Sequence, residues 1–260
     1  MNSMGRGIMQ NSLAAVRATL RLRGRFIHIA SFASLFVAAV PADAADPVDF
    51  AGMWKVVTPR TSILPDDRAI PFSAKGRAGY TENMRRKARK DMEFDLTTSR
   101  CSSPGVPRVM LTPQRFRIFQ DTSVMMIGFE WNRVRRAIGM PALAPQISLF
   151  NAAEEAKLVG TKMGTARAQW EGNTLVVVTT ELSDATLLDD LVPHGFGLKV
   201  TERLTLKDAD TLEDRLTIED PEYFTRPWGT VLTYHRQSDA IFPEDICLDR
   251  VFGKPALPTK

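Results

Sequence analysis

His194 is the residue of this 260-residue sequence whose side chain is best suited to proton transfer near neutral pH. Asp189 and Asp190 lie a few residues before it in a polar loop, and Glu202 follows on the next predicted strand. An imidazole oriented by a carboxylate can act as a general base or acid. With Glu130 from a neighbouring strand, these residues predict a site for proton abstraction, elimination or hydration. The other interpretation is that His194 hydrogen-bonds a loop carbonyl and organises the turn.

Four aromatic residues and one arginine could bind an apolar or aromatic small molecule. Tryptophan and tyrosine combine a large apolar surface with one polar atom, which suits a ligand pocket, although tryptophans on strands are more often part of the core. The side chains that we predict to bind such a ligand are Trp131, Arg133, Trp170, Tyr223 and Trp228.

Signals for other chemistries are weak. His194, Asp189 and His235 match no known metal-ligand spacing, and the two cysteines form no C-x-x-C motif. The sequence contains no G-x-S-x-G motif, no phosphate-binding P-loop and no dinucleotide fingerprint. We therefore expect neither a metal nor any other cofactor.

The elements that must position these residues are short strands. Many of them alternate apolar with polar residues and are separated by polar turns, which is typical of antiparallel sheets, and strands do not alternate with helices as in a Rossmann-type sheet. We predict a mainly β, calycin-like antiparallel barrel or sandwich of about eight strands with one N-terminal helix, at 74–91. The candidate strands are 49–56, 115–120, 123–131, 134–140, 165–170, 174–181, 198–206, 211–218 and 229–236.

Residues 1–44 have the pattern of an export signal. Four arginines between positions 17 and 25 form a basic region, residues 27–40 form an apolar run, and Ala42-Asp43-Ala44 fits the small-x-small cleavage pattern. The apolar run is too short for a comfortable membrane span. We predict a periplasmic or secreted protein with one barrel-like domain at 45–260 and no transmembrane segment after removal of the signal.

The charge of the mature chain argues against nucleic acid as a partner. The full sequence has 34 Lys and Arg residues and 30 Asp and Glu residues, but residues 1–44 contain five of the arginines and one aspartate. The remaining chain has no net charge, whereas a nucleic-acid-binding domain carries a surplus of positive charge.

Cys101 and Cys247 are the only two cysteines. A single pair in an exported protein most simply forms one disulfide, which here would tie the C-terminal tail to the body of the domain.

Residues 70–236 contain a series of short motifs. In their types and order these motifs resemble those of a large group of exported, β-rich bacterial proteins without an agreed activity. The resemblance implies a barrel-like fold and export, and it assigns no reaction. Relatives in that group often have a tryptophan where this sequence has Leu187 and a serine where it has Gly195. The motifs are C-x-x-P-G-x-P-R from Cys101, F-E-W-N from Phe129, W-E-G-N-T-L from Trp170, Pro193-His194, Glu202-Arg203, and D-P-x-x-F-T-x-P-W from Asp220.

Two functions follow from these observations. The first is a β-barrel that binds a small apolar or aromatic molecule, since barrels of about eight strands leave room for one small ligand. The alternative is a cofactor-independent lyase, isomerase or hydrolase that uses His194 with acidic partners. The two differ in whether His194 and a carboxylate meet in a pocket.

Overall fold

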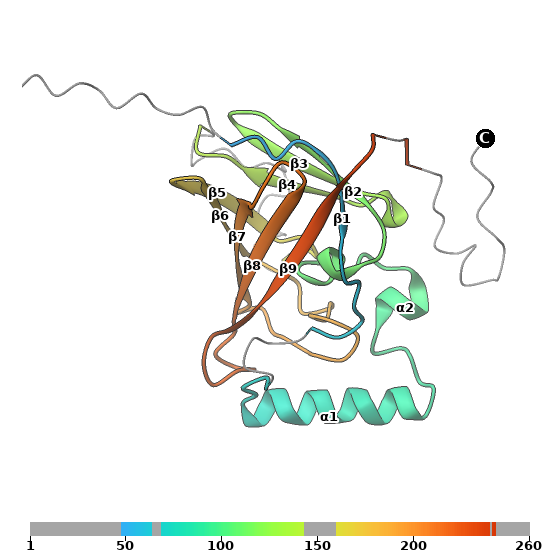
Figure 1. Ribbon diagram of the computed structural model, residues 1–260. Coiled ribbons are helices and arrows are strands. Elements are labelled where there is room, and N and C mark those ends of the chain that lie inside the picture. Colours follow the sequence, from blue (N-terminus) through green and yellow to red (C-terminus); the bar gives the residue numbers. More distant parts are fainter. Residues whose placement is uncertain (1–47, 64–68, 143–159, 240, 243–260) are drawn as a thin grey trace, which may run out of the picture. The chain divides into compact units, whose positions relative to one another are not determined.

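The structure is a computed structural model that describes residues 48–63, 69–142, 160–239 and 241–242. Nine strands form a closed barrel in which each strand pairs with the next along the chain and the last pairs with the first (Figure 1). The strands are β1 (Gly52–Val56), β2 (Phe116–Gln120), β3 (Val124–Phe129), β4 (Arg135–Gly139), β5 (Thr165–Glu171), β6 (Thr174–Thr180), β7 (Lys199–Leu206), β8 (Thr211–Glu219) and β9 (Trp228–Gln237).

The predicted barrel is confirmed, with nine strands where about eight were expected, and the sandwich alternative is excluded by closure. An odd number of strands cannot close with antiparallel pairs alone. The one parallel pair joins β4 to β5, with Ile138 opposite Ala166. It has the fewest paired residues of all the strand pairs in the barrel. The other eight pairs are antiparallel, as the alternating sequence pattern predicts.

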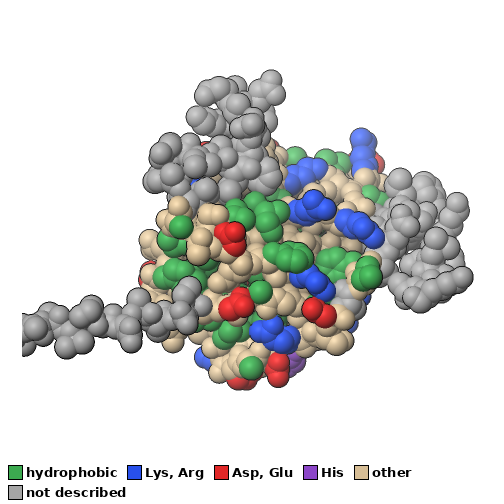
Figure 2. All heavy atoms as spheres, turned by 90° about the horizontal axis from the view of Figure 1, so that it is seen from above, with side chains coloured by type: hydrophobic (Ala, Val, Ile, Leu, Met, Phe, Trp, Pro, Cys, Tyr) green, Lys and Arg blue, Asp and Glu red, His purple; other side chains and the backbone are tan. Residues whose placement is uncertain are grey.

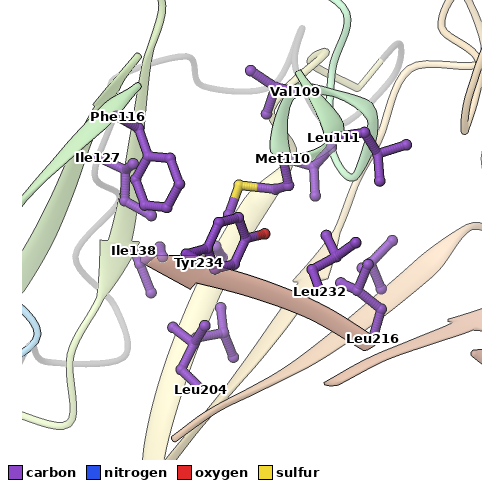
Figure 3. Packing of buried hydrophobic residues seen from close by; sticks show 14 of the residues in the cluster. Val109, Met110, Leu111, Phe116, Ile127, Ile138, Leu204, Leu216, Leu232 and Tyr234 are labelled. Carbon is purple, nitrogen blue, oxygen red and sulfur yellow. The ribbon is translucent and has the colours of Figure 1, made fainter. Parts of the chain in front are cut away.

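The alternation along each strand points one set of side chains into the barrel. On β8 the buried residues are Leu212, Asp214, Leu216 and Ile218, and the residues between them are more exposed. A single hydrophobic core fills the barrel and extends to the 3-10 helix η1 (Arg108–Leu111), whose last three residues are all buried. Figure 3 shows Met110 of η1 beside Tyr234 of β9, so η1 closes the core at one end of the barrel.

The two ends of the barrel differ in their connections. Tight turns join β2 to β3, β5 to β6 and β7 to β8 at one end. Long connections join β1 to β2, β6 to β7 and β8 to β9 at the other end, and they carry α1 (Ala74–Ala88), α2 (Leu96–Arg100) and η1. We call this second end the α1 end, because α1 lies across it (Figure 1).

Helix α1 begins where Ser73 accepts a hydrogen bond from the amide of Gly76, and three basic residues in its last turn complement the helix dipole. Gly76 is its one buried residue. A Cβ at Gly76 would lie 2.1 Å from the carbonyl oxygen of Tyr223, so only glycine allows the helix to approach the β8–β9 connection this closely. Asn83 binds the carbonyl of Leu191 at 2.9 Å, which fixes α1 to the β6–β7 loop as well.

The predicted helix at 74–91 corresponds to α1, whereas α2 and η1 were not predicted. No helix among the described residues is long and apolar enough to cross a membrane. Residues 1–44 and Cys247 lie outside the described residues, so the export signal and the disulfide stay predictions.

Candidate functional site

His194 lies in the β6–β7 loop at the α1 end, with 2 % of its surface exposed. Its Nδ1 donates to the carbonyl of Gly195 at 3.0 Å, and its Nε2 lies 2.9 Å from the hydroxyl of Thr186. Burial lowers the pKa of His194, and the Gly195 carbonyl and the charges of Asp220 and Asp184 only partly oppose this effect. Both ring nitrogens are therefore engaged within the loop and its flanks.

The carboxylate of Asp189 stabilises the same loop by binding backbone amides. Its carboxylate accepts hydrogen bonds from the amides of Ile63, Leu191 and Val192 at 2.7–2.8 Å. Burial raises the pKa of Asp189 although these amides act in the opposite direction. Asp190, in contrast, points to two cations, with Arg108 at 2.7 Å and Lys87 at 3.6 Å.

The other two predicted acids have partners elsewhere. Glu202 points into the barrel and forms a buried ion pair with Arg136. Glu130 pairs with Arg115, at 2.9 Å between Oε1 and the guanidinium, although Arg133 and Arg135 are closer to it in sequence. The reason is geometric, because Arg115 precedes β2 and lies across the β2–β3 ladder from Glu130, whereas the turn after Glu130 directs Arg133 away. Among the described residues, no hydrogen bond joins His194 to any of the predicted acids.

The predicted ligand-binding aromatics lie at separate places. Trp170 stacks on Phe50 with ring centroids 5.9 Å apart. Trp228 is buried against Phe224, and Tyr223 lies under the ammonium of Lys75. Trp131, in the 3-10 helix η2 (Trp131–Arg133), lines a pocket together with Asp189.

This pocket, which we call the end pocket, has a volume of about 270 Å³ and lies at the α1 end. Its walls come from the segment after β1, from α2, from η1 with its flanks, from η2 and from the β6–β7 loop. The indole of Trp131 and the side chain of Leu111 give it an apolar surface, and threonines give it hydroxyls. The residues that matter for its chemistry are Arg60, Thr61, Leu111, Trp131, Asp189 and Asp190.

Arg60 is the arginine of the end pocket that forms no ion pair among the described residues. Its backbone amide binds the carbonyl of Leu111 at 3.1 Å, and its Nη2 donates to the carbonyl of Val231 at 3.2 Å. Its buried Nε has no hydrogen-bond partner among the described residues. Because the Arg60 guanidinium forms no ion pair among the described residues, its charge is available to an anionic group in the pocket, whose oxygens would accept hydrogen bonds from it.

Arg108 is the second arginine of the end pocket, and its charge is already paired with two carboxylates. It forms a two-pronged contact with Asp95 at 2.7 and 2.9 Å and binds Asp190 at 2.7 Å. Burial would lower the pKa of Arg108, but the two carboxylates raise it overall. This network ties α2, η1 and the β6–β7 loop together, so it supports one wall of the pocket.

A second group of polar residues lies inside the barrel. We call it the interior cluster, and it consists of Arg136 on β4, Thr179 on β6, Glu202 on β7, Asp214 on β8 and Tyr234 on β9. Arg136 binds Glu202 through both terminal nitrogens and donates to Thr179 at 2.8 Å. All five side chains are fully or almost fully buried.

Several atoms of the interior cluster lack a hydrogen-bond partner among the described residues. They are Nε of Arg136, both carboxylate oxygens of Asp214 and the hydroxyl of Tyr234. Burial raises the pKa of Asp214 well above its ordinary value and the charge of Glu202 adds to this, while Arg136 and the approaching amide of Arg203 oppose it. The cluster can thus hydrogen-bond small polar molecules such as internal water.

The sequence contains a signal for the interior cluster in the charged residues at inward positions of two alternating strands. Asp214 stands between Leu212 and Leu216 at an inward position of an alternating strand, and Glu202 stands likewise between Val200 and Leu204. A charge at such a position must be buried and needs a partner. No comparable signal marks Arg60, because its segment is irregular.

No protein-family model and no curated protein matches the sequence. The solved structures that match include the crystal structure of a single-residue mutant of the fluorescent protein UnaG. It is 14% identical, with a TM-score of 0.35, and the match covers 73% of this chain and 97% of that chain. A likeness at this level carries no argument about ligand or activity, so the function rests on the geometry of the site.

Proposed function

We propose that this protein is a small-molecule-binding barrel whose end pocket takes a one- or two-ring aromatic molecule with an anionic group. The observation that carries the proposal is that Trp131 and Arg60, an arginine without an ion pair among the described residues, line the same pocket. Aromatic surface with a few convergent polar groups is the usual composition of a ligand site.

The size of the pocket sets the size of the ligand. Its volume of about 270 Å³ is close to the lower limit of roughly 300 Å³ for typical small-molecule pockets. A ligand of one or two rings fits this space, while a long acyl chain does not. The carboxylates of Asp189 and Asp190 already bind amides or cations, so they leave the charge of Arg60 available.

The enzymatic alternative receives no geometric support of its own. His194 uses both ring nitrogens within its loop region, and Asp189, Glu202 and Glu130 each have other partners among the described residues. Catalysis by His194 would require a carboxylate or a substrate within hydrogen-bonding reach.

The test is a matched pair of ligands measured by isothermal titration calorimetry. Naphthalene-1-carboxylate carries the charge, and 1-naphthalenemethanol has the same rings without it. We expect Arg60→Gln to weaken binding of the carboxylate about tenfold, the worth of a charge-assisted hydrogen bond, and to leave the alcohol nearly unchanged. Trp131→Leu should weaken the binding of both ligands.

Two control variants separate the pocket from general effects. Arg85→Gln removes an exposed arginine of α1, and Trp170→Leu removes a tryptophan outside the end pocket. Neither should change the affinity for either ligand. Equal affinity of the carboxylate for the Arg60→Gln variant and the unchanged protein would refute the proposed site.

We further propose that the protein is exported, with residues 1–44 removed. The support is the basic region, the apolar run and the Ala42-Asp43-Ala44 pattern. Mass spectrometry of the protein from a periplasmic extract should find Ala45 at the N-terminus. Full-length protein confined to the cytoplasm would contradict export.

A further inference from the structure

The interior cluster contains polar atoms that the protein itself leaves without hydrogen-bond partners. On the inward face of the barrel, Asp214 of β8 has Glu202 of β7 and Tyr234 of β9 as its diagonal neighbours. Both carboxylate oxygens of Asp214, the hydroxyl of Tyr234 and the Nε of Arg136 nevertheless lack a hydrogen bond among the described residues. The amide of Arg203 approaches the carboxyl of Asp214 without completing one.

Bulk water does not complete these hydrogen bonds. The side chains of the interior cluster are fully or almost fully buried, and a buried polar atom normally has a partner in the protein or in an ordered small molecule. On the outer surface, in contrast, basic, acidic and hydrophobic side chains are mixed and reach solvent, as Figure 2 shows for the face seen from above. A further molecule inside the barrel would therefore satisfy the interior cluster.

The charges and hydrogens of the interior cluster define what that molecule must offer. Glu202 binds both terminal nitrogens of Arg136, so the charge of this arginine is balanced. Burial raises the pKa of Asp214 well above its ordinary value, and a neutral carboxyl donates its O–H. The hydrogens left for a ligand are those of the Asp214 carboxyl, the Tyr234 hydroxyl and the Arg136 Nε. An ammonium group would require Asp214 to be ionised, and an anion would find no unbalanced positive charge, so a neutral oxygen acceptor fits best.

The barrel interior around these donors is apolar. Figure 3 shows Tyr234 among aliphatic and aromatic side chains, with Phe116 and Ile127 on one side of its ring and its hydroxyl on the other, toward Leu232. Phe116 meets Tyr234 edge to face, with ring centroids 5.0 Å apart. A ligand whose oxygen lies at the Tyr234 hydroxyl would therefore have its carbon atoms against apolar side chains.

We propose that the interior cluster is a second binding site, which takes a small, neutral and mainly apolar molecule through its carbonyl oxygen. This oxygen accepts hydrogen bonds from the Tyr234 hydroxyl, the Asp214 carboxyl and the Arg136 Nε. A tyrosine and a neutral carboxyl in apolar surroundings form a donor pair suited to such an oxygen. The site differs from the end pocket in its chemistry, because the end pocket offers the charge of Arg60 to an anion.

The helix η1 separates the interior cluster from the end pocket. Leu111 of η1 lines the end pocket, whereas Met110 lies beside Tyr234 (Figure 3). Methionine is unbranched and has three rotatable bonds, so Met110 is able to make room beside Tyr234 by changing its rotamer. A ligand would thus enter past η1, and a ketone with one small ring is the appropriate probe.

The experiment titrates the whole chain with cyclopentanone that carries carbon-13 at its carbonyl, and follows the carbonyl resonance by NMR. The resonance should move downfield on binding, because the oxygen accepts hydrogen bonds. Tyr234→Phe and Asp214→Leu should each weaken binding about fivefold, the usual worth of one hydrogen bond. Asp214→Asn retains an N–H donor and should bind the ketone nearly as well as the unchanged protein. Methylenecyclopentane, in which a methylene group replaces the oxygen, should not displace the ketone.

Matched controls carry similar substitutions outside the barrel interior. Tyr80→Phe, on α1, and Asp210→Asn, at an exposed position, should leave the affinity for cyclopentanone unchanged. Circular dichroism checks that each variant is folded, and Tyr234→Phe decides the matter if Asp214→Leu is not. The proposal is overturned if the protein binds no ketone, if Tyr234→Phe leaves the affinity unchanged, or if Trp131→Leu lowers it and Tyr234→Phe does not.

Discussion

Burial decides the charge state of two titratable side chains that the folded protein encloses. It favours the protonated, neutral form of Asp214 inside the barrel and the unprotonated, neutral form of His194 at the α1 end. The two pKa shifts have opposite signs, so the stability contributed by Asp214 falls as pH rises, whereas the stability contributed by His194 falls as pH is lowered.

Asp214→Asn should stabilise the protein at neutral pH. The folded-state pKa of Asp214 lies above its unfolded value, so stability from this group is complete at low pH and is lost as pH rises toward the folded-state pKa. Asparagine has a similar shape and cannot ionise. The gain in unfolding free energy, measured with urea, should therefore grow between about pH 4 and pH 8.

The exposed residue Asp210 provides the matched control for Asp214. Its side chain is 79% exposed, and Asp210→Asn should have an effect near zero at every pH. If Asp214→Asn destabilised the protein equally at all pH values, the carboxyl would not be the neutral, buried group that the interior cluster indicates.

His194→Ala should lower the unfolding free energy by about 1–2 kcal/mol, because it removes two buried hydrogen bonds. The folded-state pKa of His194 is lowered, so its contribution is present above its unfolded pKa of about 6.5 and is lost as pH falls. The difference between the two proteins should hence shrink from about pH 8 to pH 5.

The exposed His235 provides the control for His194, and His235→Ala should change the unfolding free energy little. If His194 instead has the acid/base role predicted from the sequence, the opposite result is expected for His194→Ala. In that case His194→Ala would abolish turnover of a substrate and leave the thermal midpoint within a few degrees.

At the scale of elements, the helices α2 and η1 at the α1 end are too short to be stable by themselves. Ion pairs that they share hold them in place. Helix α2 has only five residues, and its cap is Asp95, the same carboxylate that binds Arg108 of η1. Burial would raise the pKa of Asp95, but Arg108 outweighs it and lowers the pKa overall. One arginine thus links α2 and η1 to Asp190 of the β6–β7 loop.

Arg108→Met should lower the unfolding free energy by about 3 kcal/mol, because it leaves Asp95 buried without its cation. It should also weaken the binding of naphthalene-1-carboxylate to the end pocket, because the Arg108 network supports one wall of that pocket. Arg85→Met, at an exposed pair on α1, should stay within about 0.5 kcal/mol of the unchanged protein in urea unfolding. Equal effects of the two variants would contradict a structural role for the network.

At the scale of the whole molecule, the predicted link between Cys101 and Cys247 closes a loop that contains most of the barrel. Cys247→Ser should lower the unfolding free energy by up to about 4–5 kcal/mol, as expected for a loop of this length. Thiol titration of the unfolded, unreduced protein should detect no free thiol. Two free thiols would show that the cysteines are unpaired.

The sequence by itself determined which segments become strands. The predicted segments 115–120, 174–181 and 211–218 correspond within a residue to β2, β6 and β8. These predictions were possible because alternation and turn residues are local properties. At Gly172, for example, φ is 58°, as the tight turn between β5 and β6 requires.

Only the tertiary structure decided which side chains meet. Closure of nine strands forces the presence of a parallel pair, here β4–β5, and the inward faces of β4, β7 and β8 then bring Arg136, Glu202 and Asp214 together from distant parts of the sequence. The tight turn at η2 likewise separates Trp131 from Arg133, although only one residue lies between them. Such contacts depend on the register and closure of the whole barrel, and a local pattern contains neither.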